Sequence, residues 1–358
     1  MRLVANGAQG DLLAGLHIRR TSVALRDRKW LKTMLTHEVY MSSPVPTASV
    51  AARTLRYTSV TAALFAFALV VWGGIVRINN AGMTCPDWPR CRGVWFPALN
   101  DSVVYEWTHR LGAPVLTLLI IATFIAAWRA RRELPAAWRA SWFSIGLLVA
   151  QVIVGALTIK YANNPPSVAA HLGLGILTFV SLLMVWFVSQ GFAGERPAAS
   201  GPYAVTLSRL ALSAAVATFC AILAAGYMSA SNAGLACTQF PLCTGWGPAE
   251  TLAQQIHMGH RLLAYLSFAL IAALALMAPQ ARALRSLSRL ALILVVIQVG
   301  LGAATIASGL EPVLRSVHQA NGALLFATLV VLTYVSYAGV PEAELAAPRP
   351  GLTPQEHS

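Results

Sequence analysis

Charged side chains are scarce in this sequence. Only 11% of its 358 residues are Asp, Glu, Lys or Arg, while 57% are hydrophobic. A soluble domain carries about 25% charged residues, so this shortage excludes an ordinary soluble fold, and the apolar excess excludes a disordered chain. Cysteine is rare as well, and five cysteines are too few for a disulfide-built scaffold of this length. The composition indicates an integral membrane protein.

Acidic residues are half as numerous as basic ones, 13 against 26, which gives a net charge of +13. In a chain this apolar, the positions of the positive charges matter more than their sum. They gather in every second loop, as the positive-inside rule describes, where they also contact anionic lipid. We therefore expect membrane lipid, and no nucleic acid, around this protein.

Eight apolar stretches are long enough to cross a bilayer as helices, which takes about 20 residues each. Basic residues precede the first stretch and fill the second-to-third and sixth-to-seventh connections, so both termini are predicted to be cytoplasmic. The predicted spans cover about 58–76, 111–128, 141–159, 167–190, 210–229, 262–277, 290–308 and 316–338.

Polar markers of the first four spans recur in the last four. The sequence Asn-Ala-Gly-x-x-Cys begins at Asn80 and again at Asn232. Because each half has an even number of spans, both halves face the same way across the membrane. We predict an all-α integral membrane protein made of two tandem, pseudo-symmetric four-helix bundles, with eight transmembrane helices. We call the two four-helix halves the N-half (57–194) and the C-half (195–340). A disordered cytoplasmic extension (1–56) precedes them and a disordered cytoplasmic tail (341–358) follows. The true start of the extension is Met1 or Met41.

Four histidines open spans that run inward from the outer surface. His109 and His171 open two spans of the N-half, and His260 and His318 repeat them in the C-half. Ionisable residues within spans are costly and mark function, and two imidazoles at one depth suit axial ligation of a haem iron. A zinc or di-iron site needs more ligands, and only Glu106 is available. The alternative is that each histidine makes an interhelical hydrogen bond.

Glu106 breaks the symmetry of the two halves. It precedes His109 by three residues, whereas His257 precedes His260. A carboxylate near a haem edge can accept a proton or stabilise positive charge, so Glu106 is the candidate catalytic residue. The alternative is that this carboxylate only stabilises the first turn of its helix.

Further polar residues lie around these histidines. The pairs Cys85–Cys91 and Cys237–Cys243 lie in external loops, where disulfides form, and such small rings are plausible redox partners because a strained or exposed disulfide is easily reduced. Gln151 and Gln298 lie within spans and are expected to form interhelical hydrogen bonds, with contact to a haem substituent as the alternative. Four arginines lie at the outer boundary of the membrane. Their guanidinium groups can pair with haem propionates or extend to lipid head groups. These residues are Arg77, Arg110, Arg261 and Arg315.

Glu-Trp-Thr-His-Arg at 106–110, the two Asn-Ala-Gly-x-x-Cys loops and His260-Arg261 with His318 resemble the haem A synthase family over about residues 57–338. The resemblance implies an oxidoreductase that converts the C8 methyl group of haem O to a formyl group through a hydroxymethyl intermediate, with oxygen from water. The product is haem A for cytochrome c oxidase. It implies that His109 and His171 bind the substrate haem, that His260 and His318 bind a haem b cofactor, and that Glu106 is catalytic.

The resemblance also implies a bacterial inner-membrane location, with haem O synthase and cytochrome c oxidase assembly factors as partners. The electron acceptor and the oligomeric state, a homo-oligomer included, stay open. A di-haem b-type cytochrome that only transfers electrons is the alternative function, but it leaves the difference between Glu106 and His257 unexplained. A transporter built of two four-helix repeats is a third, in which the histidines would relay protons.

Overall fold

The computed structural model describes residues 48–100, 102–191, 202–243, 247–277 and 281–338. Within these ranges it contains eight helices and no strand, and each helix is long and apolar enough to span a membrane. This confirms the predicted all-α membrane fold. The helices, all part of one compact unit from Val50 on, are α2 (Val50–Ile78), α3 (Val103–Arg129), α4 (Pro135–Lys160), α5 (Pro165–Ser189), α6 (Pro202–Ala230), α7 (Leu252–Leu276), α8 (Arg282–Ala307) and α9 (Pro312–Ala338).

Several helices begin earlier than the apolar pattern predicts. The first, α2, begins at Val50, inside the segment 1–56 that the sequence assigns to the extension; residues 1–47 lie outside the described ranges. In α7 the start is fixed by a capping box, in which the Thr251 side chain accepts from the Gln254 amide and the Gln254 side chain accepts from the Thr251 amide. Polar residues in the first turns of α3 and α7 hide these starts from a hydropathy argument.

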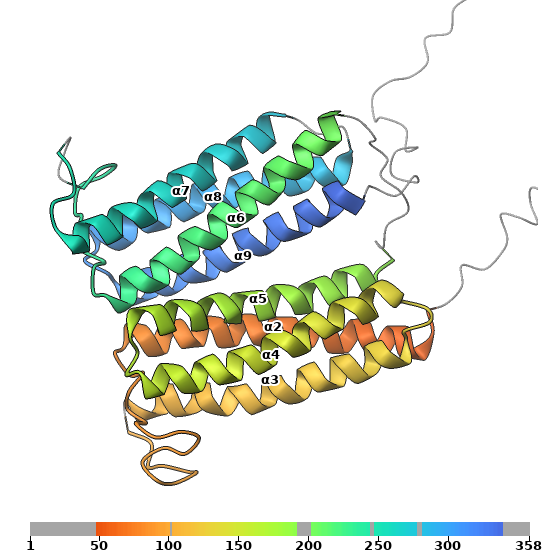
Figure 1. Cartoon of the computed structure of the whole chain (residues 1–358), viewed down its shortest axis with the longest axis horizontal. Coiled ribbons are helices and arrows are strands. Elements are labelled where there is room, and N and C mark those ends of the chain that lie inside the picture. Colours follow the sequence, from red (N-terminus) through yellow and green to blue (C-terminus); the bar gives the residue numbers. More distant parts are fainter. Residues whose placement is uncertain (1–47, 101, 192–201, 244–246, 278–280, 339–358) are drawn as a thin grey trace, which may run out of the picture. The chain divides into compact units, whose positions relative to one another are not determined.

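Each half closes into a ring of four packed helices. Helix α2 packs on α3 and α5, and α4 packs on α3 and α5; α6, α7, α8 and α9 repeat the same order (Figure 1). The halves meet through α5 against α6 and α2 against α9. Accordingly, 56% of the most apolar window is buried in α5 and in α9, against 11% in α4 and 17% in α8. This arrangement confirms the two tandem bundles.

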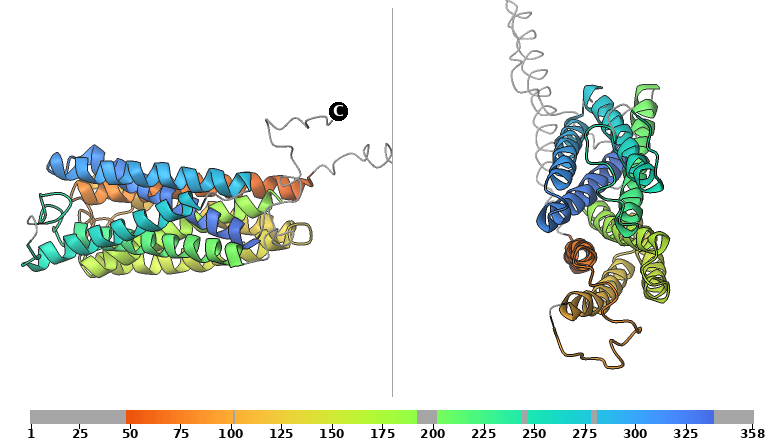
Figure 2. Two further views of the ribbon diagram at one scale, coloured as in Figure 1. Left: turned by 90° about the horizontal axis from the view of Figure 1, so that it is seen from above. Right: turned by 90° about the vertical axis from the view of Figure 1, so that its left-hand side faces the viewer.

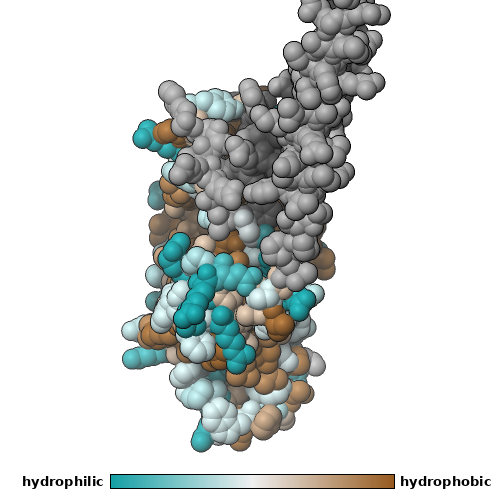
Figure 3. Space-filling view, turned by 90° about the vertical axis from the view of Figure 1, so that its right-hand side faces the viewer, coloured by the Kyte–Doolittle hydropathy of each residue, from teal (hydrophilic) through white to brown (hydrophobic). Residues whose placement is uncertain are grey.

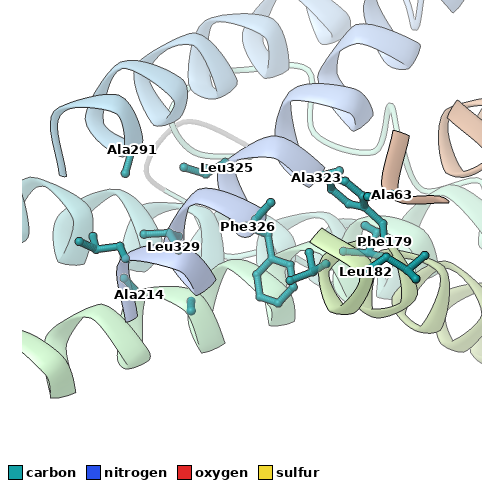
Figure 4. Close-up of a cluster of buried hydrophobic side chains, with 14 of the residues drawn as sticks. Ala63, Phe179, Leu182, Ala214, Ala291, Ala323, Leu325, Phe326 and Leu329 are labelled. Atoms are coloured by element: carbon teal, nitrogen blue, oxygen red, sulfur yellow. The ribbon is translucent and has the colours of Figure 1, made fainter. Parts of the chain in front are cut away.

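The seam between the halves holds one continuous hydrophobic cluster. Phe179 and Leu182 of α5 lie in it with Phe326 of α9 (Figure 4). Small residues such as Ala63 and Ala323 line the same cluster, and small side chains allow membrane helices to approach closely. The seam is therefore a packed core rather than a site.

The helices run along one common direction, so their ends gather at two faces of the bundle (Figure 2). The α2–α3 and α6–α7 loops lie at the same end as the short α4–α5 and α8–α9 connections (Figure 1). We call this end the loop face. At the other end, which carries the α3–α4 connection, hydrophilic side chains gather between hydrophobic flanks (Figure 3).

Candidate functional site

His109 and His171 face each other inside the N-half, near the loop face. Their ring centroids are 6.4 Å apart and their planes are 84° from parallel. A metal–imidazole bond is about 2 Å long and the ring centre lies about 1 Å farther, so two axial ligands of one metal have centroids about 6 Å apart. Both Nδ1 atoms are buried without a hydrogen-bond partner among the described residues. The pair therefore fits an iron between its rings.

Two glycines make room for these rings. A Cβ atom placed on Gly73 of α2 or on Gly155 of α4 would lie 3.0 Å from Cε1 of His109 or of His171, respectively. Preferred carbon–carbon contacts are about 3.5–4.0 Å. Each imidazole is thus seated directly on backbone that only glycine provides.

The C-half holds the second histidine pair. Nδ1 of His260 donates to the carbonyl oxygen of Ala221 at 3.0 Å, which orients the ring and leaves Nε2 for a metal. A Cβ atom added to Gly302 would lie 3.2 Å from Cε1 of His318, so this ring packs directly against the glycine. Nε2 of His318 lies 3.2 Å from Nε2 of Gln298, the amide nitrogen of which donates to it in this structure. The C-half thus repeats a histidine ring packed against a glycine, with a glutamine amide beside it.

The two halves agree in side-chain packing as well as in sequence. Gly155 faces His171 as Gly302 faces His318. A Cβ atom added to Gly175 or to Gly322 would in both cases lie 3.2 Å from a glutamine Nε2 atom, that of Gln151 or of Gln298. The repeat therefore builds the same arrangement twice, and we call it the cradle: a histidine ring, the glycine it packs against and a glutamine amide one turn away.

Glu106 fastens the α2–α3 loop to α3. The side chain is only 3% exposed. Oε2 accepts hydrogen bonds from the Cys85 amide at 2.8 Å and the Thr84 hydroxyl at 2.9 Å, and Oε1 pairs with the Arg110 guanidinium at 2.6 Å. The carboxylate thus binds loop residues and Arg110, rather than the first-turn amides of α3 that the capping alternative requires.

His257 does the corresponding work in the C-half. Its imidazole is 2% exposed, and Nδ1 donates to the Ala233 carbonyl of the α6–α7 loop at 3.1 Å. Ala236 replaces Thr84 at the matching position, so the hydroxyl donor is absent there. Both halves tie the loop to the helix, but only the N-half does so with a charged carboxylate.

Arg110 and Arg261 bind matching loop carbonyls. Arg261 donates to Cys237 at 2.7 Å and to Leu242 at 3.1 Å, as Arg110 donates to Cys85 and, at 2.7 Å, to Arg90. Both also reach the carbonyl two residues beyond the first cysteine. These loop carbonyls are partners that the sequence did not suggest, and pairing of the guanidinium groups with haem propionates or lipid stays a prediction. Arg77 binds the Ser229 carbonyl at 2.8 Å, which links α2 to α6.

Both predicted cysteine pairs form disulfides, Cys85–Cys91 and Cys237–Cys243. All four cysteines are at most 5% exposed, and the first pair packs on Val103 and Trp107. Each loop folds back over its own sulfur atoms, so both disulfides are shielded from solvent. At the rim of the first loop, the Gly93 amide, followed by that of Arg92, lowers the pKa of Asp87.

The family is decided by comparison with known proteins. The model of the COX15-CtaA family, described as cytochrome oxidase assembly protein, matches residues 56–104 and 100–330. The chain belongs to this family. Relatives named Heme A synthase include one from Bacillus licheniformis, 27% identical over 68% of this chain and 83% of the relative, and one from Bacillus pumilus, 27% identical over 60% and 71%. The predicted resemblance is thereby confirmed.

Some residues of the site escaped the sequence argument. Asn321 donates to Oε1 of Gln298 at 2.7 Å, and Thr84 donates to Glu106. Each differs from its counterpart in the other half, which is the signal that could have found them. The glycines beneath the histidine rings carry a weaker signal, because glycine is common in membrane helices.

Proposed function

We propose that this chain is a haem A synthase, an oxidoreductase that converts the C8 methyl group of haem O to a formyl group with oxygen from water. The conversion adds one water oxygen and releases four electrons and four protons, by way of the hydroxymethyl intermediate, to an external acceptor. The observation that carries the proposal is the His109–His171 pair, whose rings lie 6.4 Å apart in a chain of the COX15-CtaA family. The relatives named Heme A synthase support it.

In this proposal the two halves have different tasks. The N-half, 57–194, binds haem O between His109 and His171, and the C-half, 195–340, holds haem b between His260 and His318. Haem b, when bound, supplies a centre that exchanges single electrons. The asymmetry of Glu106 and His257 supports this order, because only the N-half has a carboxylate next to its histidine pair.

Glu106 is the proposed proton acceptor. It lies one helical turn from His109 on the same face of α3, and its contact with Arg110 holds it in place. When the methyl group is oxidised, the carboxylate would take the released proton or stabilise the positive charge on the carbon. Arg110, Thr84 and the Cys85 amide hold it in one position throughout.

The location and partners follow from the same proposal. Basic residues in the α3–α4 connection favour a cytoplasmic position for that end, which would place the loop face and both disulfides outside. Haem O synthase and cytochrome c oxidase assembly factors are the proposed partners, since they would supply the substrate and take the product.

Two measurements on the purified protein test this function. Co-expression with haem O synthase, followed by chromatography of extracted haems, should give haem A, and the Soret absorbance should disappear in a His260→Ala, His318→Ala variant purified without haem O. In Glu106→Gln we expect both haems to stay bound while haem O or the alcohol accumulates. Bound haem without any formyl product from the wild type would instead support the di-haem cytochrome.

A further inference from the structure

Two matching glutamines have different partners. In the C-half, Oε1 of Gln298 accepts a hydrogen bond from Asn321 at 2.7 Å. In the N-half, Oε1 of Gln151 is buried and has no hydrogen-bond partner among the described residues. A buried carbonyl oxygen without a partner is costly, and such atoms are rare enough in folded proteins to need an explanation.

The difference comes from the partner rather than from the placement of the amide. A Cβ atom added to Gly175 would lie 3.2 Å from Nε2 of Gln151, and one added to Gly322 would lie at the same distance from Nε2 of Gln298. The residue that matches Asn321 at the repeat spacing is Leu174, which has no hydrogen-bonding group. The N-half therefore keeps the amide of the C-half but lacks the side chain that satisfies it.

The Gln151 amide lies beside the histidine pair. Gly155, one turn along α4 from Gln151, is the residue on which the His171 ring is seated. In the C-half, the matching amide reaches Nε2 of His318 at 3.2 Å. The unpartnered amide thus lies one helical turn from the glycine that packs against a proposed ligand of the substrate haem.

We infer that the Gln151 amide binds the side-chain hydroxyl of haem O. This inference rests on the proposed function, because it requires the substrate to occupy the N-half. Haem O carries a hydroxyethylfarnesyl group at the position where haem b carries a vinyl group. A hydroxyl both donates and accepts, so it can pair with either atom of an amide. It would satisfy the amide of Gln151 as Asn321 satisfies that of Gln298.

The same contact explains how similar cradles can hold different porphyrins. Haem b lacks the hydroxyl, and in the half proposed for it the amide oxygen is already occupied by Asn321. In the N-half, binding haem b would leave the buried oxygen of Gln151 unpaired. A site built to pair with a hydroxyl discriminates against an analogue that lacks it for this reason.

The test is a binding comparison on the purified, full-length protein carrying its resident haem b. Haem O and haem B are titrated separately into the N-half, and the Soret absorbance gives the ratio of their dissociation constants. In Gln151→Leu we expect the preference for haem O to fall about fivefold, the size of a hydrogen bond between groups in a membrane. The affinity for haem B should rise or stay as in the wild type, because leucine leaves no amide oxygen unpaired, and a residual preference should persist because the farnesyl tail is still buried.

A second variant keeps the glutamine. Leu174→Asn introduces the side chain that occupies Gln298 in the other half, so it should capture the Gln151 amide and lower the preference for haem O by a similar factor. Leu174→Ala is the matched control, which removes the same leucine without adding a hydrogen-bonding group and should keep the wild-type preference. Retention of haem b reports that each variant is folded, and if Gln151→Leu does not fold, Leu174→Asn decides.

The outcomes separate this inference from the proposed function. An unchanged preference in Leu174→Asn and in any folded Gln151→Leu overturns the inference, as does an equal loss of affinity for both haems, which would indicate a structural role. Wild-type turnover of haem O to haem A is measured in parallel. If the wild type makes haem A and these variants keep its preference, only the inference fails; if it makes none, the proposed function fails with it.

Discussion

Replacing Gly155 by alanine should move an axial ligand without touching it directly. The added Cβ atom would lie 3.0 Å from Cε1 and 3.5 Å from Nδ1 of His171. Carbon atoms prefer separations of about 3.5–4.0 Å, so the ring must shift by about 0.5 Å. Metal–ligand distances tolerate only about 0.2 Å. Changes to the groups that orient a ligand typically lower metal affinity about 10- to 100-fold, and we expect a loss in that range for haem O.

The matched control lies on the same helix. Gly146 of α4 is exposed, and a Cβ atom there would have nothing within 4 Å. Alanine is favoured over glycine in a helix interior by about 0.5–1 kcal/mol, so Gly146→Ala should leave the free energy of unfolding unchanged or slightly raised. Comparing the two variants therefore separates the contact with His171 from the general effect of removing a glycine.

The assay is titration of each purified variant with haem O, followed by Soret absorbance, together with chromatography of extracted haems after co-expression with haem O synthase. Gly155→Ala should retain its resident haem b while haem O binding and haem A yield fall. Wild-type affinity for haem O in Gly155→Ala would refute the reasoning, because the His171 ring would then not be the ligand that this backbone positions.

The remaining predictions concern the other cradle, the loops and the topology. In Gly302→Ala the added Cβ atom would lie 3.2 Å from Cε1 of His318. This variant should lower the content of resident haem, measured after purification, by a smaller factor than Gly155→Ala lowers haem O affinity. Gly300→Ala, where a Cβ atom would have nothing within 4 Å, should leave the haem content unchanged. Arg110→Ala removes charge-assisted hydrogen bonds to three loop carbonyls, each worth about 1.5–3 kcal/mol. Reduction of Cys85–Cys91, measured by alkylation and mass spectrometry, should therefore be at least about tenfold faster. An unchanged rate would show that the loop does not depend on this guanidinium. In intact spheroplasts, a membrane-impermeant thiol reagent should label this pair after reduction, and labelling only after lysis would reverse the proposed orientation.

Sequence reasoning succeeded wherever one strong physical term decides the outcome. Spanning helices follow from the cost of leaving backbone groups unpaired in lipid, and the repeat alone predicts two four-helix units. It also brought His109 and His171 together, because two inward-running helices with histidines near their starts share a depth. The 6.4 Å separation of the rings agrees with that argument.

It failed where several short-range partners compete. Arg110 and Arg261 bind loop carbonyls that were not among the two partners considered, because hydropathy does not encode where those carbonyls lie. Burial of the disulfides likewise depends on how each loop closes. The early start of α7 comes from the Thr251 capping box, which lies within a polar stretch that an apolar window discards.

The differences between the halves carry more functional information than their similarities. The glycine beneath a histidine and the arginine that binds the loop occur in both, so they describe what it takes to hold a porphyrin at all. Glu106 against His257 and Leu174 against Asn321 change the charge and the hydrogen-bonding capacity around one pair only. A fold shared by both halves cannot account for a reaction in one of them. Exchanging residues at these two positions between the halves should therefore change the chemistry while leaving the helical scaffold in place.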